Sequence, residues 1–260
     1  MELIKSADSR YDVYETLLLE RDQVRKEAGQ IWTAYLKAFG QLVTQVYEEK
    51  VECVKRKKAI TFCQQAINHG GTVDADKLRG YLDAEMANYY ANLKSMQQDY
   101  ETSKASGMST EYEVQRSKTL YRRLAKLLHP DINPATAKEE KLMELWNRAV
   151  TAYGHNDVKE LAELEVLVGN ALKELQIGEI TVDIPDIEEK IEALKEEIEE
   201  IKQTEPYTYK ELVGSEEKSR NKTLELENEL ETYRQYHTEL DRVLQGMIDG
   251  GRVHIQWPMN

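Results

Sequence analysis

Cysteine is scarce in this chain, with only Cys53 and Cys63 among its 260 residues. The two residues lie ten positions apart on a predicted helix, which is too far for them to bridge each other. Two cysteines also cannot supply a four-cysteine zinc site. The sequence therefore indicates a reduced, cytoplasmic protein without a disulfide framework.

Proline, long apolar runs and excess positive charge are also lacking, and each lack excludes a class of structure or function. No proline precedes Pro130, so the first half of the chain can form long uninterrupted helices. No apolar run has the length of a signal core or a membrane span, and we expect no membrane association. A net charge of -13 argues against general nucleic-acid binding.

Helical periodicity dominates the N-terminal region. Residues 11–68 are predicted to form one long helix or two collinear helices, with Gly29 and Gly40 as places where the helix bends. The apolar positions recur at spacings of three, four or seven: Val24, Ala28, Ile31, Tyr35, Leu42 and Val46. A Gly-Gly pair ends this helix, and a second helix follows over residues 75–104. Residues 1–105 are therefore predicted to be a long, coiled-coil-like helical hairpin.

The C-terminal region, residues 171–260, has two heptad seams separated by a break at Pro206. The first contains Ile187, Ile191, Leu194, Ile198 and Ile201, and the second contains Leu226, Leu230, Tyr233, His237, Leu240, Leu244 and Met247. Such seams form hairpins within a chain or pair between chains, so a coiled-coil hairpin and self-association are both expected here. An alternating stretch at Ile180, Val182 and Ile184 predicts a short strand, with the tail around Ile255 as its expected partner.

Residues 106–170 form the central region, with helices expected at about 113–128, 136–153 and 158–168. Its most informative segment is Leu120–Pro134. Pro130 disfavours helix at His129, so the basic helix ends there and leaves a short loop that presents His129 and Asp131. Residues 115–128 contain five bases and no acid: Arg116, Lys118, Arg122, Arg123 and Lys126. A basic helix that ends in such a loop is typical of a docking surface for an acidic partner.

This segment, YRRLAKLLHPD, resembles the second helix and the His-Pro-Asp loop of J domains. Downstream, LWNRAVTAY is similar to the third helix of that family, in which an aromatic residue and a terminal Ala-Tyr pack on the second helix. Trp146, Ala152 and Tyr153 match those positions, and residues after 154 match the short fourth helix. The predicted fold is all-α, with a J-domain-like helical hairpin between long helical or coiled-coil hairpins.

The resemblance implies a co-chaperone that docks on the ATPase domain of a DnaK-type heat-shock chaperone and stimulates ATP hydrolysis. In the family, the basic helix faces acidic residues of the chaperone and the Asp of the loop pairs with an Arg. The implied partner-binding residues are Tyr121, Arg122, Arg123, Lys126, His129, Pro130 and Asp131. The resemblance implies no cofactor, no catalytic residue and no bound metal. The usual first helix is absent at the expected distance, and the end of the 75–104 helix is expected to replace it.

Two classes of function stay open at this point. The first is the co-chaperone, and the second is a structural scaffold with a degenerate J-like hairpin that no longer binds a chaperone. Exposed His129 and Asp131 favour docking, whereas burial of these side chains against residues 11–104 favours the scaffold. An enzyme is not expected, because neither a phosphate-binding loop nor a catalytic constellation is present.

Overall fold

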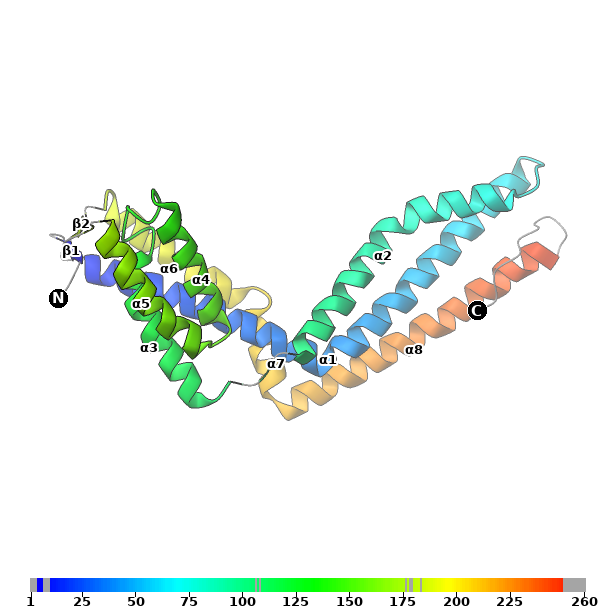
Figure 1. Ribbon diagram of the computed structural model, residues 1–260. Helices are drawn as coiled ribbons and strands as arrows, with labels where there is room; N and C mark the ends of the chain where they lie inside the picture. The colour runs from blue at the N-terminus through cyan, green and yellow to red at the C-terminus, as the bar shows by residue number, and fades with distance from the viewer. Residues whose placement is uncertain are drawn as a thin grey trace. The chain divides into compact units, whose positions relative to one another are not determined.

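Helices form nearly all of the regular structure, as the sequence predicts. The computed structural model describes residues 4–6, 10–105, 107, 109–175, 177, 180–182 and 184–249. The helices are α1 (Tyr11–Asn68), α2 (Ala75–Ala105), α3 (Glu111–Leu128), α4 (Glu140–Gly154), α5 (Val158–Glu174), α6 (Ile187–Gln203), α7 (Lys210–Gly214) and α8 (Glu216–Met247), with a 3-10 turn at Tyr207–Tyr209 (Figure 1). The fold class is therefore all-α. No helix in the described ranges is both long and apolar enough to cross a membrane.

The chain divides into two compact units that differ from the three consecutive regions expected. Unit 1 combines residues 1–32 with 107–210, and unit 2 combines 33–106 with 211–260. Helix α1 contributes its first part to unit 1 and its remainder to unit 2. The chain divides within α1 because different helices pack on its two parts: α6 packs on the first part, and α2 and α8 pack on the remainder.

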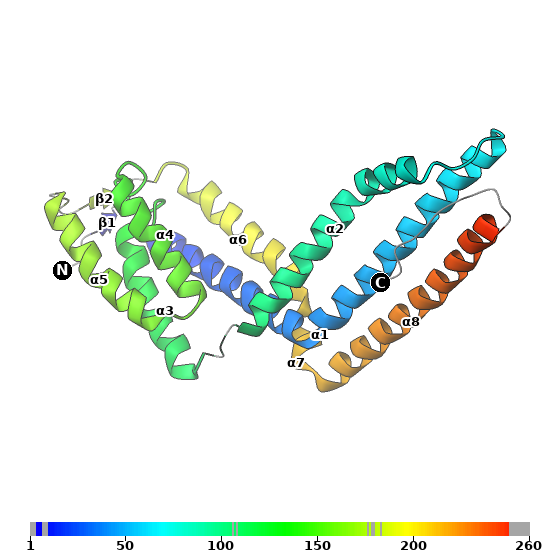
Figure 2. The same ribbon diagram turned by 45° about the vertical axis from the view of Figure 1, so that its right-hand side comes forward.

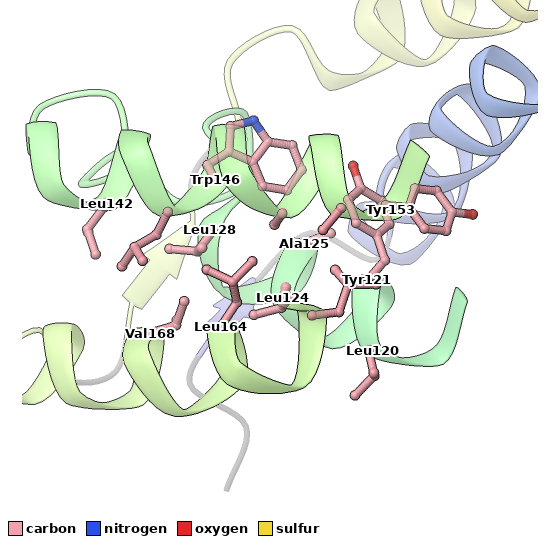
Figure 3. Packing of buried hydrophobic residues seen from close by; sticks show 14 of the residues in the cluster. Leu120, Tyr121, Leu124, Ala125, Leu128, Leu142, Trp146, Tyr153, Leu164 and Val168 are labelled. Atoms are coloured by element: carbon pink, nitrogen blue, oxygen red, sulfur yellow. The ribbon is translucent and has the colours of Figure 1, made fainter. Parts of the chain in front are cut away.

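Helices α3, α4 and α5 form the main core of unit 1. Their buried side chains make one cluster, which includes Leu124, Leu128, Trp146, Leu164 and Val168 (Figure 3). Helix α5 packs against both α3 and α4, and so completes a three-helix bundle. The helix expected to complete the J-like unit was α2, but α2 belongs to unit 2.

The first part of α1 packs on α6 in unit 1. Tyr11, Tyr14 and Leu18 form an apolar cluster with three residues of the first heptad seam, Ile187, Ile191 and Leu194. Ile132, from the loop after α3, is the seventh member of this cluster and is fully buried. Three residues of the first seam are thus buried against α1.

Unit 2 contains the remainder of α1, together with α2 and α8, which run beside one another (Figure 2). Leu244 of the second seam lies in an apolar cluster with Ala59 and Cys63 of α1 and with Leu78 and Leu82 of α2. Both cysteines are buried and free. Most apolar residues of both seams are buried within the chain, whereas Ile201, Tyr233 and Met247 are half-buried. Self-association through the seams stays a prediction.

The two glycines expected to bend the first helix lie inside the continuous helix α1. Gly40 has a packing role in unit 2, because a Cβ at this position would lie 2.6 Å from the Tyr100 ring. The predicted strand is present as β2 (Ile180–Val182). Its partner is β1 (Ile4–Ser6), which pairs with it in parallel. The tail expected as the partner lies outside the described residues.

Candidate functional site

Helix α3 presents the basic segment, and its ends are defined by local chemistry. At its start, the Thr110 hydroxyl accepts from the Glu113 amide and the Glu113 carboxylate accepts from the Thr110 amide, which is a capping box. At its end, His129 has a ψ of 123°, the extended conformation that a following proline imposes. The helix therefore stops where the sequence predicts. Helix α4 begins later than expected, at Glu140, and Thr136 lies in the preceding turn.

A bonded turn follows α3 and holds the His-Pro-Asp segment. The His129 carbonyl accepts from the amides of Ile132 and Asn133, at 2.9 and 2.7 Å. The buried Asn133 side chain donates to the Leu127 carbonyl at 2.7 Å and accepts from the Ala135 amide at 3.0 Å. These bonds fix the turn without a contribution from the side chain of Asp131.

His129 does not face solvent, in contrast to the expectation from the sequence. Its side chain is only 3% exposed. Its ring meets Trp146 edge-on with ring centroids 4.9 Å apart, and its Nε2 lies 3.2 Å from Arg21 Nη2 of α1. The expectation was wrong because it treated α3 and its loop alone, whereas α1 covers this side of the turn.

The contacts of His129 indicate a neutral imidazole. Both ring nitrogens face donors, because the Arg21 guanidinium can only donate and lies at Nε2, and the Asp131 amide donates to Nδ1 at 3.1 Å. The Asp131 carboxylate lies farther away, with its Oδ2 3.8 Å from Nδ1. Burial lowers the pKa of His129 and outweighs the opposing effect of Asp22 and Asp131. His129 is thus a buried packing residue whose ring links α3, α4 and α1.

Tyr121 is also buried against α1. Its ring stacks on Tyr153, with centroids 4.0 Å apart, and its hydroxyl donates to Asp22 Oδ2 at 2.6 Å. Burial, followed by the charge of Asp22, raises the pKa of the Tyr121 hydroxyl far above its usual range. In Figure 3 the two tyrosine rings lie at the end of the core nearest to α1.

The remaining residues implied by the resemblance lie at the surface. Arg122 and Arg123 are exposed, and Arg123 pairs with Glu165 of α5 at 3.3 Å. Lys126 is half-exposed and pairs with Glu15 of α1 at 2.7 Å. Pro130 is half-buried, and the Asp131 side chain is 47% exposed. The structure therefore separates the seven residues into a buried pair, Tyr121 and His129, and five others with access to solvent.

Lys26 of α1 is a buried base that the sequence analysis did not identify. Its ammonium lies 3.6 Å from the centre of the Tyr153 ring and bonds to Asn156 Oδ1 and Ser117 Oγ, both neutral. Burial, assisted by the charge of Lys118, lowers the pKa of Lys26 to about 8. Asn156 has a φ of 55°, a left-handed conformation that asparagine tolerates better than most residues.

Three polar residues of α1 meet the α3 face, and the sequence analysis missed all of them. Glu15, Arg21 and Asp22 contact Lys126, His129 and Tyr121 in that order. Glu15 and Asp22 are seven positions apart and so share one face of the helix. The apolar spacing of α1 predicts the helix, but it does not identify the charged residues between the apolar positions as contacts of α3.

The described residues contain no cluster of three His, Cys, Asp or Glu side chains that could hold a metal ion. The α3 face carries donors on a basic helix and one carboxylate on the turn. Comparison of the chain with models of protein families, with curated proteins and with solved structures finds no match.

Proposed function

We propose that this protein is a J-domain-type co-chaperone, which docks on a DnaK-type ATPase through α3 and the His-Pro-Asp turn and stimulates ATP hydrolysis. The observation that carries the proposal is the placement of Asp131. Its half-exposed carboxylate stands on a bonded turn at the end of a basic helix, and that helix packs on α4 through Trp146 and Tyr153. The sequence resemblance supplies the identity of the partner.

The turn is suited to recognition by an arginine of the partner. A carboxylate accepts two parallel bonds from a guanidinium, which is one of the stronger polar contacts in proteins. The backbone bonds from Ile132 and Asn133 already fix the turn, so docking orders little additional chain. Asp131 therefore offers a pre-organised acceptor, and the chain contributes no catalytic group of its own to the partner's reaction.

The exposed guanidinium groups of Arg122 and Arg123 support an acidic partner surface. Surface charges of this kind mainly accelerate association, and salt weakens their effect. We therefore expect docking to weaken as ionic strength rises. Charge reversal at both positions should reduce the association rate while leaving the fold intact, since neither side chain is in the core.

The test is a single-turnover ATPase assay with a DnaK-type chaperone and the full chain. Asp131→Asn should reduce stimulation at least tenfold, on the order of one charge-assisted hydrogen bond. Glu163→Gln is the matched control, because it removes an exposed carboxylate from α5 of the same unit. Equal stimulation by wild type and Asp131→Asn, or none by any variant, would contradict the proposal.

A structural scaffold is the second candidate, and the burial of Tyr121 and His129 against α1 favours it. In that case the turn serves only to pack α3, α4 and α1 together. Asp131→Asn would then change neither the melting temperature nor any ATPase rate, while substitutions at His129 would affect stability alone.

A further inference from the structure

The α3 face assigned to the chaperone is already in contact with another part of the same chain. Three of its residues bond to α1: Tyr121 to Asp22, Lys126 to Glu15, and His129 to Arg21. All six residues belong to unit 1, in which these helices are placed together. We infer that the first part of α1, residues 11–32, is an internal competitor that closes the docking face. This inference rests on the function proposed above.

The chemistry of α1 at this contact is that of an acidic partner. Its two carboxylates, Glu15 and Asp22, receive the ammonium of Lys126 and the hydroxyl of Tyr121, which are donors on the α3 face. Its guanidinium, Arg21, binds the ring of His129 beside the Asp131 carboxylate. An external acidic surface that carries an arginine would need the same donors and acceptors, so the two occupants exclude each other.

The contact between α1 and α3 is incompletely packed. A groove of about 510 Å³ runs along it, with Glu15 and Glu20 on one wall and Lys118, Arg122 and Lys126 on the other. Arg122 thus remains accessible while the face is closed, and so does the half-exposed Asp131. In the closed protein, Arg122 and Asp131 are therefore the groups of this face that a partner can contact first.

The contact between α1 and the rest of unit 1 also contains a buried charge that destabilises it. The Lys26 ammonium is buried, and its bonds go to the neutral groups of Asn156 and Ser117. A buried charge without a counter-charge among its bonded groups weakens the closed arrangement and favours release of α1. On either side of Glu15, the apolar cluster of Tyr11, Tyr14 and Leu18 with α6 and with Ile132 of the turn keeps the start of α1 attached.

Two variants should shift the ratio of closed to open protein in opposite directions. Glu15→Lys together with Asp22→Lys replaces both carboxylates by like charges and opens the face. Lys26→Met retains the apolar stem, removes the buried charge and closes the face more firmly. Each lost charge-assisted bond changes the ratio of closed to open protein by roughly tenfold or more.

The experiment compares single-turnover ATPase stimulation by wild type, the double variant and Lys26→Met, all as full chains. Asp12→Lys is the control, because it makes the charge change of one of the two substitutions at an exposed position of the same helix. The inference expects the double variant to stimulate several-fold more than wild type, Lys26→Met less, and Asp12→Lys the same. If the double variant fails to fold, as judged by thermal unfolding, the decrease with Lys26→Met decides the question.

The possible failures are distinguishable. Equal stimulation by wild type, the double variant and Lys26→Met overturns the closed face and leaves the co-chaperone function intact. No stimulation by any of them, the double variant included, overturns the co-chaperone function and the inference with it. Stimulation by the double variant that survives Asp131→Asn shows that the opened face acts by another route, and also overturns the inference.

Discussion

Replacement of Lys26 by methionine should stabilise unit 1. The ammonium is buried, and its pKa is lowered from 10.5 to about 8. Each pKa unit of that difference corresponds to 1.36 kcal/mol, and solvent screening reduces the total, so the charged lysine costs the folded state on the order of 2 kcal/mol at pH 7. Methionine loses the bonds to Asn156 and Ser117 and the contact of the ammonium with the Tyr153 ring, but Asn156 and Ser117 still bond to each other at 2.7 Å. The expected net gain is about 1–2 kcal/mol.

The gain should depend on pH in a defined direction. Below pH 8 the lysine is protonated in both the folded and the unfolded chain, so wild type carries the full cost. From pH 8 to 10.5 the folded chain loses the proton while the unfolded chain keeps it. The unfolding free energy of wild type should therefore rise over this interval relative to that of Lys26→Met, and the advantage of the variant should shrink.

The assay is urea unfolding at pH 7, 8, 9 and 10, followed by the fluorescence of Trp146. Trp32→Phe and Trp257→Phe make Trp146 the only tryptophan, so that the signal reports on unit 1 alone. Lys159→Met is the control, since its side chain is 89% exposed and its loss should change the stability little. A Lys26→Met variant that is no more stable at pH 7, or whose advantage persists unchanged at pH 10, would refute this account of the buried charge.

Four further substitutions test the packing. Trp146→Ala should cost about 3–5 kcal/mol of unfolding free energy, measured by urea unfolding, because the ring is 8% exposed within the α3–α4–α5 core. His129→Ala should cost about 1–3 kcal/mol in the same assay, since it removes a buried, bonded ring; an unchanged stability would show that the ring is exposed. Gly40→Ala should lower the melting temperature, because the new methyl group meets the Tyr100 ring, whereas Gly29→Ala, with open space around it, should raise it slightly.

The helices themselves were predictable from the sequence. The apolar spacing of α1 and the proline after His129 are local signals, and the structure has a continuous helix from Tyr11 and a helix end at Leu128. Trp146 and Tyr153 of α4 pack in the core with α3, a contact that the sequence resemblance implied. Local propensity and apolar period determine these features.

The pairing of the helices was not predictable in the same way. A heptad seam can pack against another seam or against any other apolar helix face. The period of the seam alone does not determine which of these it contacts. In the structure Ile191 packs against α1 in unit 1, and Leu244 packs with α1 and α2 in unit 2. The burial of His129 has the same origin, because it depends on Arg21, which is 108 positions away.

The central claim is that the turn after α3 couples this protein to a DnaK-type ATPase. The most direct measurement is the single-turnover rate of ATP hydrolysis by the chaperone with the Glu15→Lys, Asp22→Lys double variant, with and without Asp131→Asn. Because this variant exposes the α3 face, a low rate cannot be attributed to closure by α1. The account predicts strong stimulation that Asp131→Asn reduces at least tenfold, on the order of one charge-assisted bond. A folded double variant that leaves the hydrolysis rate at its basal value would contradict the claim.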